Sequence, residues 1–183
     1  MKLLIIHNFE REDRFNLLMN ELSKQGIYDF ELMPSVHDVM GVKHGINKAH
    51  KNCVQYATDH KLDEIIIAED DVRFTHPDSF QYFLKNKPQS FDLYLSGIYL
   101  GDIVDGKVKS FSGLHLYIVH SKFYDKFLSV PADEHIDRVL GGLGDFHVCY
   151  PFAAIQHNGY SQNAMCDMNY DSLLQGRELF NGF

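Results

Sequence analysis

The chain has 183 residues, of which 45% are hydrophobic and 23% are charged, and its formal net charge is −8 at pH 7. This size and composition predict one globular domain, residues 1–183, with a single well-filled core. The negative balance argues against a surface built to neutralise nucleic-acid phosphates, so we expect no nucleic-acid partner.

The cysteines and the apolar runs indicate the cellular compartment. Cys53, Cys149 and Cys166 are widely spaced and form no Cys-x-x-Cys pair, which predicts reduced, mostly buried thiols rather than a zinc or redox site. No apolar run approaches the length of a membrane span or of a secretory signal. We therefore expect a cytoplasmic protein without a membrane span, and peripheral contact with a membrane surface stays open.

Strands and helices alternate in the first half of the chain, as the hydrophobic spacing indicates. This order is typical of an α/β fold with a mixed, mainly parallel sheet flanked by helices. The predicted elements are a strand at residues 3–6, a helix at 15–22 closed by Gly26, a strand at 27–33 ended by Pro34, a helix at 46–57 and a strand at 65–68.

The second half predicts shorter and more mixed elements. Residues 170–183 are weakly patterned and are assigned no element, so they are treated as a C-terminal tail. The predicted elements are a short helix at 80–84, a strand at 91–95, a hairpin at 103–108 around Asp105-Gly106, a strand at 114–119, a helix at 121–128 and a final edge strand at 147–151.

The most informative stretch is the apolar strand at residues 65–68, which ends at three adjacent carboxylates, Glu69, Asp70 and Asp71. Clustered negative charge at the end of a buried strand is costly unless a cation neutralises it. Open α/β sheets bind ligands at the carboxyl ends of their strands, and divalent metals take oxygen ligands there. A solvated acidic turn is the alternative, and this motif alone does not decide between them.

The alternation of side chains along an extended strand assigns the three acids to two faces. Asp71 is the first choice for a direct ligand of Mn²⁺ or Mg²⁺, and Glu69, two residues earlier on the same face, is the second. Asp70 points to the opposite face, where it contacts the fold. If this acidic protein binds a phosphorylated ligand, such an ion would neutralise the phosphate charge.

Four segments resemble glycosyltransferase family 25, whose members have a GT-A nucleotide-sugar fold and include collagen galactosyltransferases and lipopolysaccharide enzymes. The resemblance extends from residue 1 to about residue 163. His7–Arg14 resembles the family's Asn-Leu-x-Arg-x-Asp-Arg segment, Gly45–His50 its Gly-x-x-x-Ser-His segment, and Ile67–Val72 its Leu-Glu-Asp-Asp-Val signature. The fourth part of the resemblance combines Gly113–Val119, Ile136-Asp137 and Pro151–Ser161, which resemble a strand, an aspartate and a Gln-containing loop of the family.

The resemblance implies a donor, an acceptor and further site residues. The donor would be a nucleotide sugar, most often uridine diphosphate galactose, and the acceptor a glycan or lipopolysaccharide. The metal ion would neutralise the diphosphate as it leaves the sugar carbon. Asp70 would contact the donor sugar, and Glu69 would either bind the ion or face the ribose or a metal-bound water. His157 would supply a third metal ligand from a late loop, and the alternative is an exposed loop histidine. His50 matches the motif histidine, and the alternative is structural packing. Ala49 departs from the motif serine, so a hydroxyl contact there is in doubt.

The residues after the first strand are candidates for nucleotide contacts. Asn8 lies at the carboxyl end of that strand, where its side chain or backbone would meet the base or ribose. Arg11 and Arg14 can reach a diphosphate, or they can pair with Asp13 and Glu10 at the start of the first helix.

An inverting transferase needs a base that takes the proton of the acceptor hydroxyl. Asp137 matches the family aspartate and is our choice, with Asp145 and Glu134 as rivals. A helix N-terminal partner for Arg138 is the ordinary explanation of Asp137. Tyr99, Tyr150 and Tyr160 are candidates for stacking on a sugar.

Two other functions stay open. A metal-dependent phosphohydrolase would use the same acids to activate water, although only His7 is an obvious further ligand. The short chain and Ala49 keep open a non-catalytic sugar-nucleotide-binding module, whereas the intact Glu69 and Asp71 argue against it.

Overall fold

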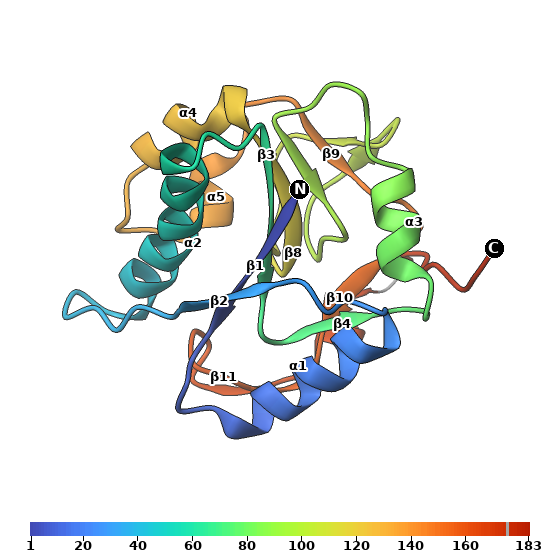
Figure 1. Ribbon diagram of the computed structural model, residues 1–183, viewed down its shortest axis with the longest axis horizontal. Coiled ribbons are helices and arrows are strands. Elements are labelled where there is room, and N and C mark those ends of the chain that lie inside the picture. The colour runs from blue at the N-terminus through green and yellow to red at the C-terminus, as the bar shows by residue number, and fades with distance from the viewer. Residues whose placement is uncertain (175) are drawn as a thin grey trace.

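The computed structural model describes residues 1–174 and 176–183. An 8-stranded mixed sheet with the order β2-β1-β3-β8-β5-β9-β7-β6 forms its centre (Figure 1). Strands β8 and β7 run against the direction of the others. The strands are β1 (Lys2–His7), β2 (Glu31–Pro34), β3 (Glu64–Glu69), β5 (Leu93–Leu95), β6 (Ile103–Val104), β7 (Lys107–Val108), β8 (Leu116–His120) and β9 (Phe146–Val148).

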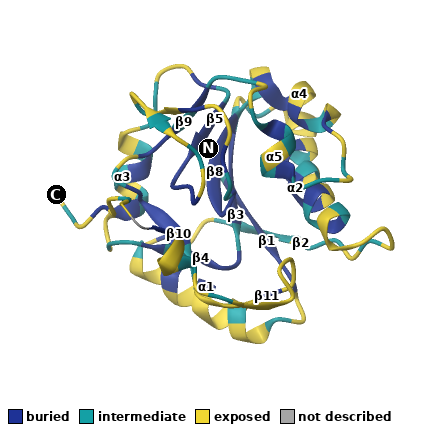
Figure 2. Ribbon diagram, turned by 180° about the vertical axis from the view of Figure 1, so that it is seen from behind, coloured by how far each residue is buried: buried dark blue, intermediate teal, exposed yellow. Residues whose placement is uncertain are grey.

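Helices cover both faces of this sheet, so the fold has three layers (Figures 1 and 2). Alternate residues of β1 divide between two cores: Leu4 joins the cluster shared with α2, α4 and α5, and Ile5 joins the cluster shared with α1 and α3. The helices are α1 (Glu12–Lys24), α2 (Val42–Asp59), α3 (Ser79–Lys85), α4 (Tyr124–Ser129) and α5 (Ile136–Leu140), with the 3₁₀ segments Ser121–Phe123 and Tyr170–Leu174.

The pairing of β1 with β3 positions the acidic motif. The two strands are parallel, and Ile6 pairs with Glu69. The residues that follow β1 therefore lie beside the residues that follow β3, at the same edge of the sheet. Both strands are buried along most of their length, which agrees with their continuous apolar sequences.

Two small sheets complete the region around the motif. Strand β4 (Val72–Phe74) begins directly after the acids and pairs antiparallel with β10 (Ala154–Gln156), so that Val72 lies opposite Gln156. Strands β11 (Gly159–Ser161) and β12 (Cys166–Met168) form a hairpin that follows β10 at once. A late segment of the chain is thus brought beside the acidic motif.

The structure confirms most of the predicted elements and the mainly parallel direction of the sheet. The hairpin is present, with Asp105 and Gly106 at φ values of 51° and 73° as its two-residue turn requires. Helix α2 begins at Val42, four residues before the predicted start. Gly45 is needed there, because a Cβ atom would lie 2.1 Å from the carbonyl oxygen of Val36.

Two sequence predictions about strands were wrong. The strand expected at residues 147–151 is β9, and it is neither final nor at an edge, since β7 pairs with it through Lys107 and His147 and three strands follow it. The strand expected from residue 27 starts only at Glu31. Cys53 and Cys149 are buried free thiols as expected, and Cys166 is an exposed one.

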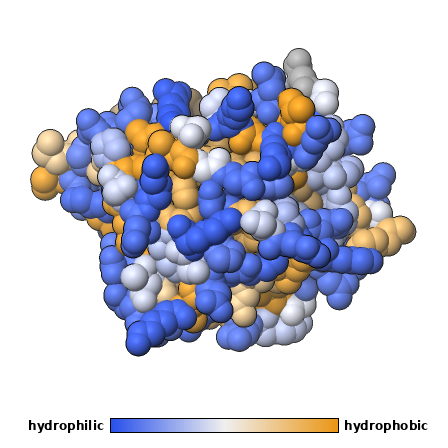
Figure 3. Space-filling view, turned by 90° about the horizontal axis from the view of Figure 1, so that it is seen from above, coloured by the Kyte–Doolittle hydropathy of each residue, from blue (hydrophilic) through white to orange (hydrophobic). Residues whose placement is uncertain are grey.

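No helix among residues 1–174 and 176–183 is long and apolar enough to cross a membrane. The face of the molecule seen in Figure 3 is mostly hydrophilic, and its hydrophobic residues form small patches between polar ones.

Candidate active site

A cavity of ≈ 360 Å³ lies at the carboxyl ends of β1 and β3. Its volume falls in the range of small-molecule sites. All seven residues predicted to bind the nucleotide sugar, or to bind the metal from the acidic motif, line it: Asn8, Arg11, Arg14, His50, Glu69, Asp70 and Asp71. Asp137 lines it as well, and a second cavity of ≈ 350 Å³ adjoins it at His50 and Glu69.

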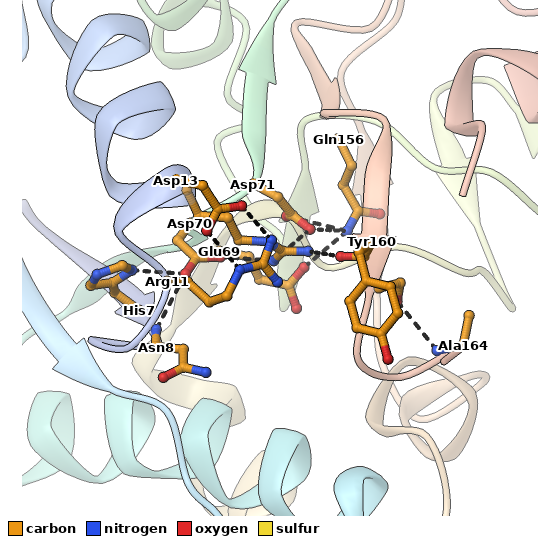
Figure 4. A network of polar contacts seen from close by, with 12 residues as sticks. His7, Asn8, Arg11, Asp13, Glu69, Asp70, Asp71, Gln156, Tyr160 and Ala164 are labelled. Atoms are coloured by element: carbon orange, nitrogen blue, oxygen red, sulfur yellow. Dashed lines mark hydrogen bonds and ion pairs between the residues drawn. The ribbon is translucent and has the colours of Figure 1, made fainter. Parts of the chain in front are cut away.

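Glu69 and Asp71 converge on one point of this cavity. The Nε2 atom of Gln156 lies 3.3 Å from Oε2 of Glu69 and 3.3 and 3.2 Å from the two carboxylate oxygens of Asp71. The two acids predicted to share one face therefore do so, with an amide nitrogen between them (Figure 4).

Asp70 turns away from this point and ties the first strand to the first helix. It is buried, and its Oδ2 accepts hydrogen bonds from the backbone N–H of Asn8 (3.2 Å) and from the His7 ring (2.8 Å). Its Oδ1 accepts a 2.9 Å hydrogen bond from Arg14. The prediction that Asp70 contacts the fold from the opposite face agrees with these contacts.

Arg14 compensates part of the negative charge. Its guanidinium lies 2.9 Å from Asp70 and 3.1 Å from Asp71, and it donates a 3.0 Å hydrogen bond to the carbonyl of Tyr160 on β11. Arg14 thus links the acidic motif to the β11–β12 hairpin. Arg11 instead pairs with Asp13 through two hydrogen bonds of 2.8 and 2.6 Å, which is the local role considered for it from the sequence.

His50 is buried and lies between two polar groups. Its Nε2 is 3.1 Å from Oε1 of Glu69, and its Nδ1 is 2.7 Å from the hydroxyl of Tyr117 on β8. His50 therefore contacts the acidic motif from within the core, so it has both a packing role and a contact with a candidate ligand.

The electrostatics of the two convergent acids differ. Burial and the neighbouring charges of Glu69 and Asp70 raise the pKa of Asp71 to about 7, although Arg14 opposes this shift. Burial also acts on Glu69, but the hydrogen bond from His50 and nearby positive charges outweigh it and hold the pKa of Glu69 below its ordinary value. The negative charge at Asp71 is thus incompletely compensated by the protein.

Asn8 presents an unused donor at the rim of the first strand. It is 8% exposed, its Oδ1 accepts a hydrogen bond from the backbone of Glu10, and its Nδ2 has no partner within the described part of the chain. A buried amide without a partner is costly, so an acceptor on a bound ligand would complete this site.

Asp137 lines the cavity from the first turn of α5. Its Oδ2 accepts a 3.1 Å hydrogen bond from the backbone N–H of Gly113, and its Oδ1 accepts one from the backbone of Arg138. Its rivals are outside the lining: Asp145 pairs with Lys107 at 2.7 Å, and Glu134 pairs with Lys43 at 3.1 Å.

His157 is not brought to the acids. Its ring lies against α1, with Nε2 at 3.9 Å from Glu21, and only its backbone N–H approaches the motif, donating to the carbonyl of Asp71 at 2.8 Å. Residues 156 and 157 follow one another in extended chain, so their side chains point to opposite sides. Gln156 faces Glu69 and Asp71, whereas His157 faces the helix.

Several lining residues were missed by sequence reasoning. Gln156 was noted only as part of a loop. Tyr170 lies in the segment that was assigned no element, and its ring lies 5.2 Å from that of Tyr99. Of the predicted stacking tyrosines, Tyr99 lines the first cavity and Tyr160 the second, whereas the Tyr150 hydroxyl accepts a hydrogen bond from Glu178 near the C-terminus.

The carboxylates of Glu69 and Asp71 fit a hard divalent cation whose remaining coordination positions are filled by waters and by the phosphates of a bound substrate. Within residues 1–174 and 176–183, no three His, Cys, Asp or Glu side chains group closely enough to hold a metal alone. Two carboxylates, Glu69 and Asp71, and the Gln156 amide do converge there. Mg²⁺ and similar ions are often held by one or two carboxylates together with waters and substrate phosphates.

No family model and no curated protein matches this sequence. Among solved structures, the chain is similar to A197 from STIV, with 15% identity over 86% of each chain and a TM-score of 0.55. It is also similar to the inositol-1-phosphate CTP transferase from T. maritima, with 10% identity, 96% of this chain, 77% of that chain and a TM-score of 0.54. At these identities the similarity concerns the fold alone. The chain therefore shares a mixed α/β fold with these two proteins, and membership of glycosyltransferase family 25 stays a prediction.

Proposed function

We propose that this protein is a metal-dependent glycosyltransferase that moves a hexose from a nucleotide diphosphate sugar to a glycan acceptor. The convergence of Glu69 and Asp71 on one point of the cavity carries this proposal. The raised pKa of Asp71 supports it, because a cation at that point would relieve the repulsion between these carboxylates.

Glu69 and Asp71 would hold Mn²⁺ or Mg²⁺, and the ion would stabilise negative charge on the departing nucleotide diphosphate. The residues of the chain then have separate tasks. Asn8 donates from Nδ2 to the nucleotide, while Arg14 keeps Asp70 and Asp71 in place and presents positive charge beside the diphosphate.

Asp137 would remove the proton from the acceptor hydroxyl. Its two backbone hydrogen bonds fix the carboxylate in the lining of the cavity that also contains the acids. An acceptor bound in the cavity beside Asp137 would lose its hydroxyl proton to this carboxylate as it attacks the sugar carbon and the sugar–phosphate bond breaks. The Tyr99 and Tyr170 rings beside this space can pack against a sugar.

The sequence resemblance to family 25 supports the finer assignments. These are uridine diphosphate galactose as donor, a glycan such as lipopolysaccharide as acceptor, and action in the cytoplasm.

Nucleotidyl transfer is a second candidate, because the chain shares its fold with a CTP transferase. A triphosphate is commonly cradled by a glycine-rich loop whose backbone approaches the phosphates. The loop between β1 and α1 is Asn8-Phe9-Glu10-Arg11 and contains no glycine. The backbone N–H of Asn8 already donates to Asp70, and that of Glu10 donates to the Asn8 side chain. The Arg11 side chain donates to Asp13. This observation favours glycosyl transfer.

The test is incubation of the protein with Mn²⁺ and a panel of nucleotide sugars, with and without oligosaccharide acceptors, followed by product separation. We expect the protein to release nucleoside diphosphate, and to release it faster when an oligosaccharide acceptor is present. Formation of sugar phosphate from added pyrophosphate would instead show nucleotidyl transfer. Release of inorganic phosphate would show a phosphohydrolase, and binding without turnover would show a non-catalytic module.

A further inference from the structure

The side-chain amide of Gln156 lies between the two candidate metal ligands, and the proposed function gives it no role. Its side chain leaves β10 and enters the space between Glu69 and Asp71, where Nε2 is within 3.3 Å of oxygens of both (Figure 4). Hydrogen bonds of this length are at the long end of the normal range, so the amide is held only weakly.

The amide nitrogen marks the place that a shared cation would take. Its N–H groups carry partial positive charge, and it lies within 3.3 Å of an oxygen of Glu69 and of an oxygen of Asp71. A divalent ion bound by both acids would occupy the same region with full positive charge. The nitrogen and the ion would therefore compete for the two carboxylates.

A half-turn of the amide resolves this competition. A glutamine side chain has a donor nitrogen at one end and an acceptor oxygen at the other, and rotation about its last torsion exchanges them. Without a cation, Oε1 would repel the carboxylates, so the nitrogen faces them. With a cation between them, Oε1 becomes a favourable ligand because such ions prefer hard oxygen donors.

The surrounding backbone holds Gln156 in position for this exchange. Its N–H donates a 2.7 Å hydrogen bond to the Tyr99 hydroxyl, and its strand pairs with Val72, the residue after Asp71. The side chain can thus rotate while its Cα atom stays fixed beside the motif. His157, the next residue, faces α1 and leaves this place to Gln156.

We propose that Gln156 is the third protein ligand of the metal ion, which it binds through Oε1 after rotation of its amide. This inference rests on the proposed function, since it adds a ligand to the ion held by Glu69 and Asp71.

The experiment measures the affinity for Mn²⁺ by the electron paramagnetic resonance signal of the free ion, with Mn²⁺ alone and with uridine diphosphate present. Gln156→Met keeps the size of the side chain and removes its oxygen, and we expect it to weaken Mn²⁺ binding about 10-fold or more. Gln156→Glu keeps an oxygen and adds charge, and we expect binding at least as tight as in the wild type. Gln55→Met on the exposed face of α2 is the control and leaves the affinity unchanged.

The opposite pattern would overturn the inference. If Nε2 only screens the carboxylates, Gln156→Met removes a competitor of the ion, so Mn²⁺ would bind equally or more tightly, and loss of binding in Gln156→Glu has the same meaning. Circular dichroism checks folding. If Gln156→Met does not fold, Gln156→Ala, which also lacks the amide oxygen, replaces it with the same expected result.

The variant Asp71→Ala distinguishes a failure of the Gln156 inference from a failure of the proposed metal-dependent function. Wild-type affinity for Mn²⁺ in Asp71→Ala, or no Mn²⁺ binding by the wild type in either condition, would contradict the metal site itself and the inference with it. Weak binding by Asp71→Ala with unchanged binding by Gln156→Met would contradict the role of Gln156 alone.

Discussion

Nε2 of His50 lies 3.1 Å from Oε1 of Glu69, and this contact leaves Oε2 as the oxygen of Glu69 that faces Gln156 and Asp71. A carboxylate only accepts hydrogen bonds, so Nε2 carries the proton. In a neutral imidazole, Nδ1 then accepts from the Tyr117 hydroxyl at 2.7 Å. A chain of hydrogen bonds from the core therefore sets the orientation of a candidate metal ligand.

Tyr117→Phe should remove the anchor of His50. We expect a loss of about 1 kcal/mol in the free energy of unfolding, because a buried ring nitrogen loses its partner, and weaker Mn²⁺-dependent binding of uridine diphosphate. Urea unfolding and calorimetry measure the two effects. Tyr124→Phe is the matched control, since the Tyr124 hydroxyl is also buried but has no partner within the described residues. Equal behaviour of the two variants would contradict the role of this chain of hydrogen bonds.

Arg14→Met should destabilise the metal-free protein by about 2–4 kcal/mol, because Asp70 and Asp71 lose their cationic partner. Mn²⁺ should raise the melting temperature of this variant more than that of the wild type, since the ion replaces part of the lost charge. The control is Arg11→Met, whose pair with Asp13 is local and more exposed, so its cost should stay within about 1 kcal/mol. Thermal unfolding with and without Mn²⁺ checks both. An equal Mn²⁺ effect in both variants would argue against an ion beside Arg14.

Asp137→Asn should leave nucleotide-sugar binding intact and slow transfer about 10²-fold or more, because a general base contributes on this scale. Asparagine keeps an oxygen that accepts from the backbone of Gly113 and loses only the acceptor of the exposed Arg138 N–H, so we expect α5 to stay in place. Asp145→Asn serves as the control outside the cavity and should change neither quantity. Calorimetry and an initial-rate assay separate the two effects. Loss of donor binding in Asp137→Asn would show that the base has been misassigned.

Glu21→Ala should destabilise the fold without a specific effect on the site. Glu21 is buried on α1, accepts a 2.9 Å hydrogen bond from the backbone of Phe74 on β4, and pairs with Lys24. Its removal leaves the Phe74 N–H unpaired, at a cost of about 1–3 kcal/mol in urea unfolding. Glu12→Ala, at the exposed start of the same helix, should cost less than about 1 kcal/mol. Similar costs for both would show that the contact with Phe74 contributes little.

The parts of the fold that could be predicted from the sequence are those that local patterns determine. The apolar run before Glu69 is buried on both faces of the sheet, so it reads as a strand without further information. The turn at Asp105-Gly106 is set by two residues that tolerate positive φ. The adjacency of Asn8 to the acids also follows, because parallel neighbouring strands end at the same edge.

The remaining parts depend on long-range contacts. Whether Gln156 or His157 faces the acids depends on where β10 meets β4, and a shift of one residue would exchange them. Tyr170 reaches the cavity only because the chain after β12 returns to it. Strand β9 is internal only because the β6–β7 hairpin, some 40 residues earlier in the chain, pairs with it through Lys107 and His147.

The central claim is that Glu69 and Asp71 hold a divalent cation that binds a diphosphate. Calorimetric titration of uridine diphosphate, with Mn²⁺ or with a chelator, into wild type and Asp71→Asn tests it most directly. We predict binding by the wild type only when Mn²⁺ is present, no binding by Asp71→Asn in either condition, and a melting temperature of the metal-free variant that equals or exceeds that of the wild type. Binding that is unchanged by the chelator, or by the substitution, would contradict the account.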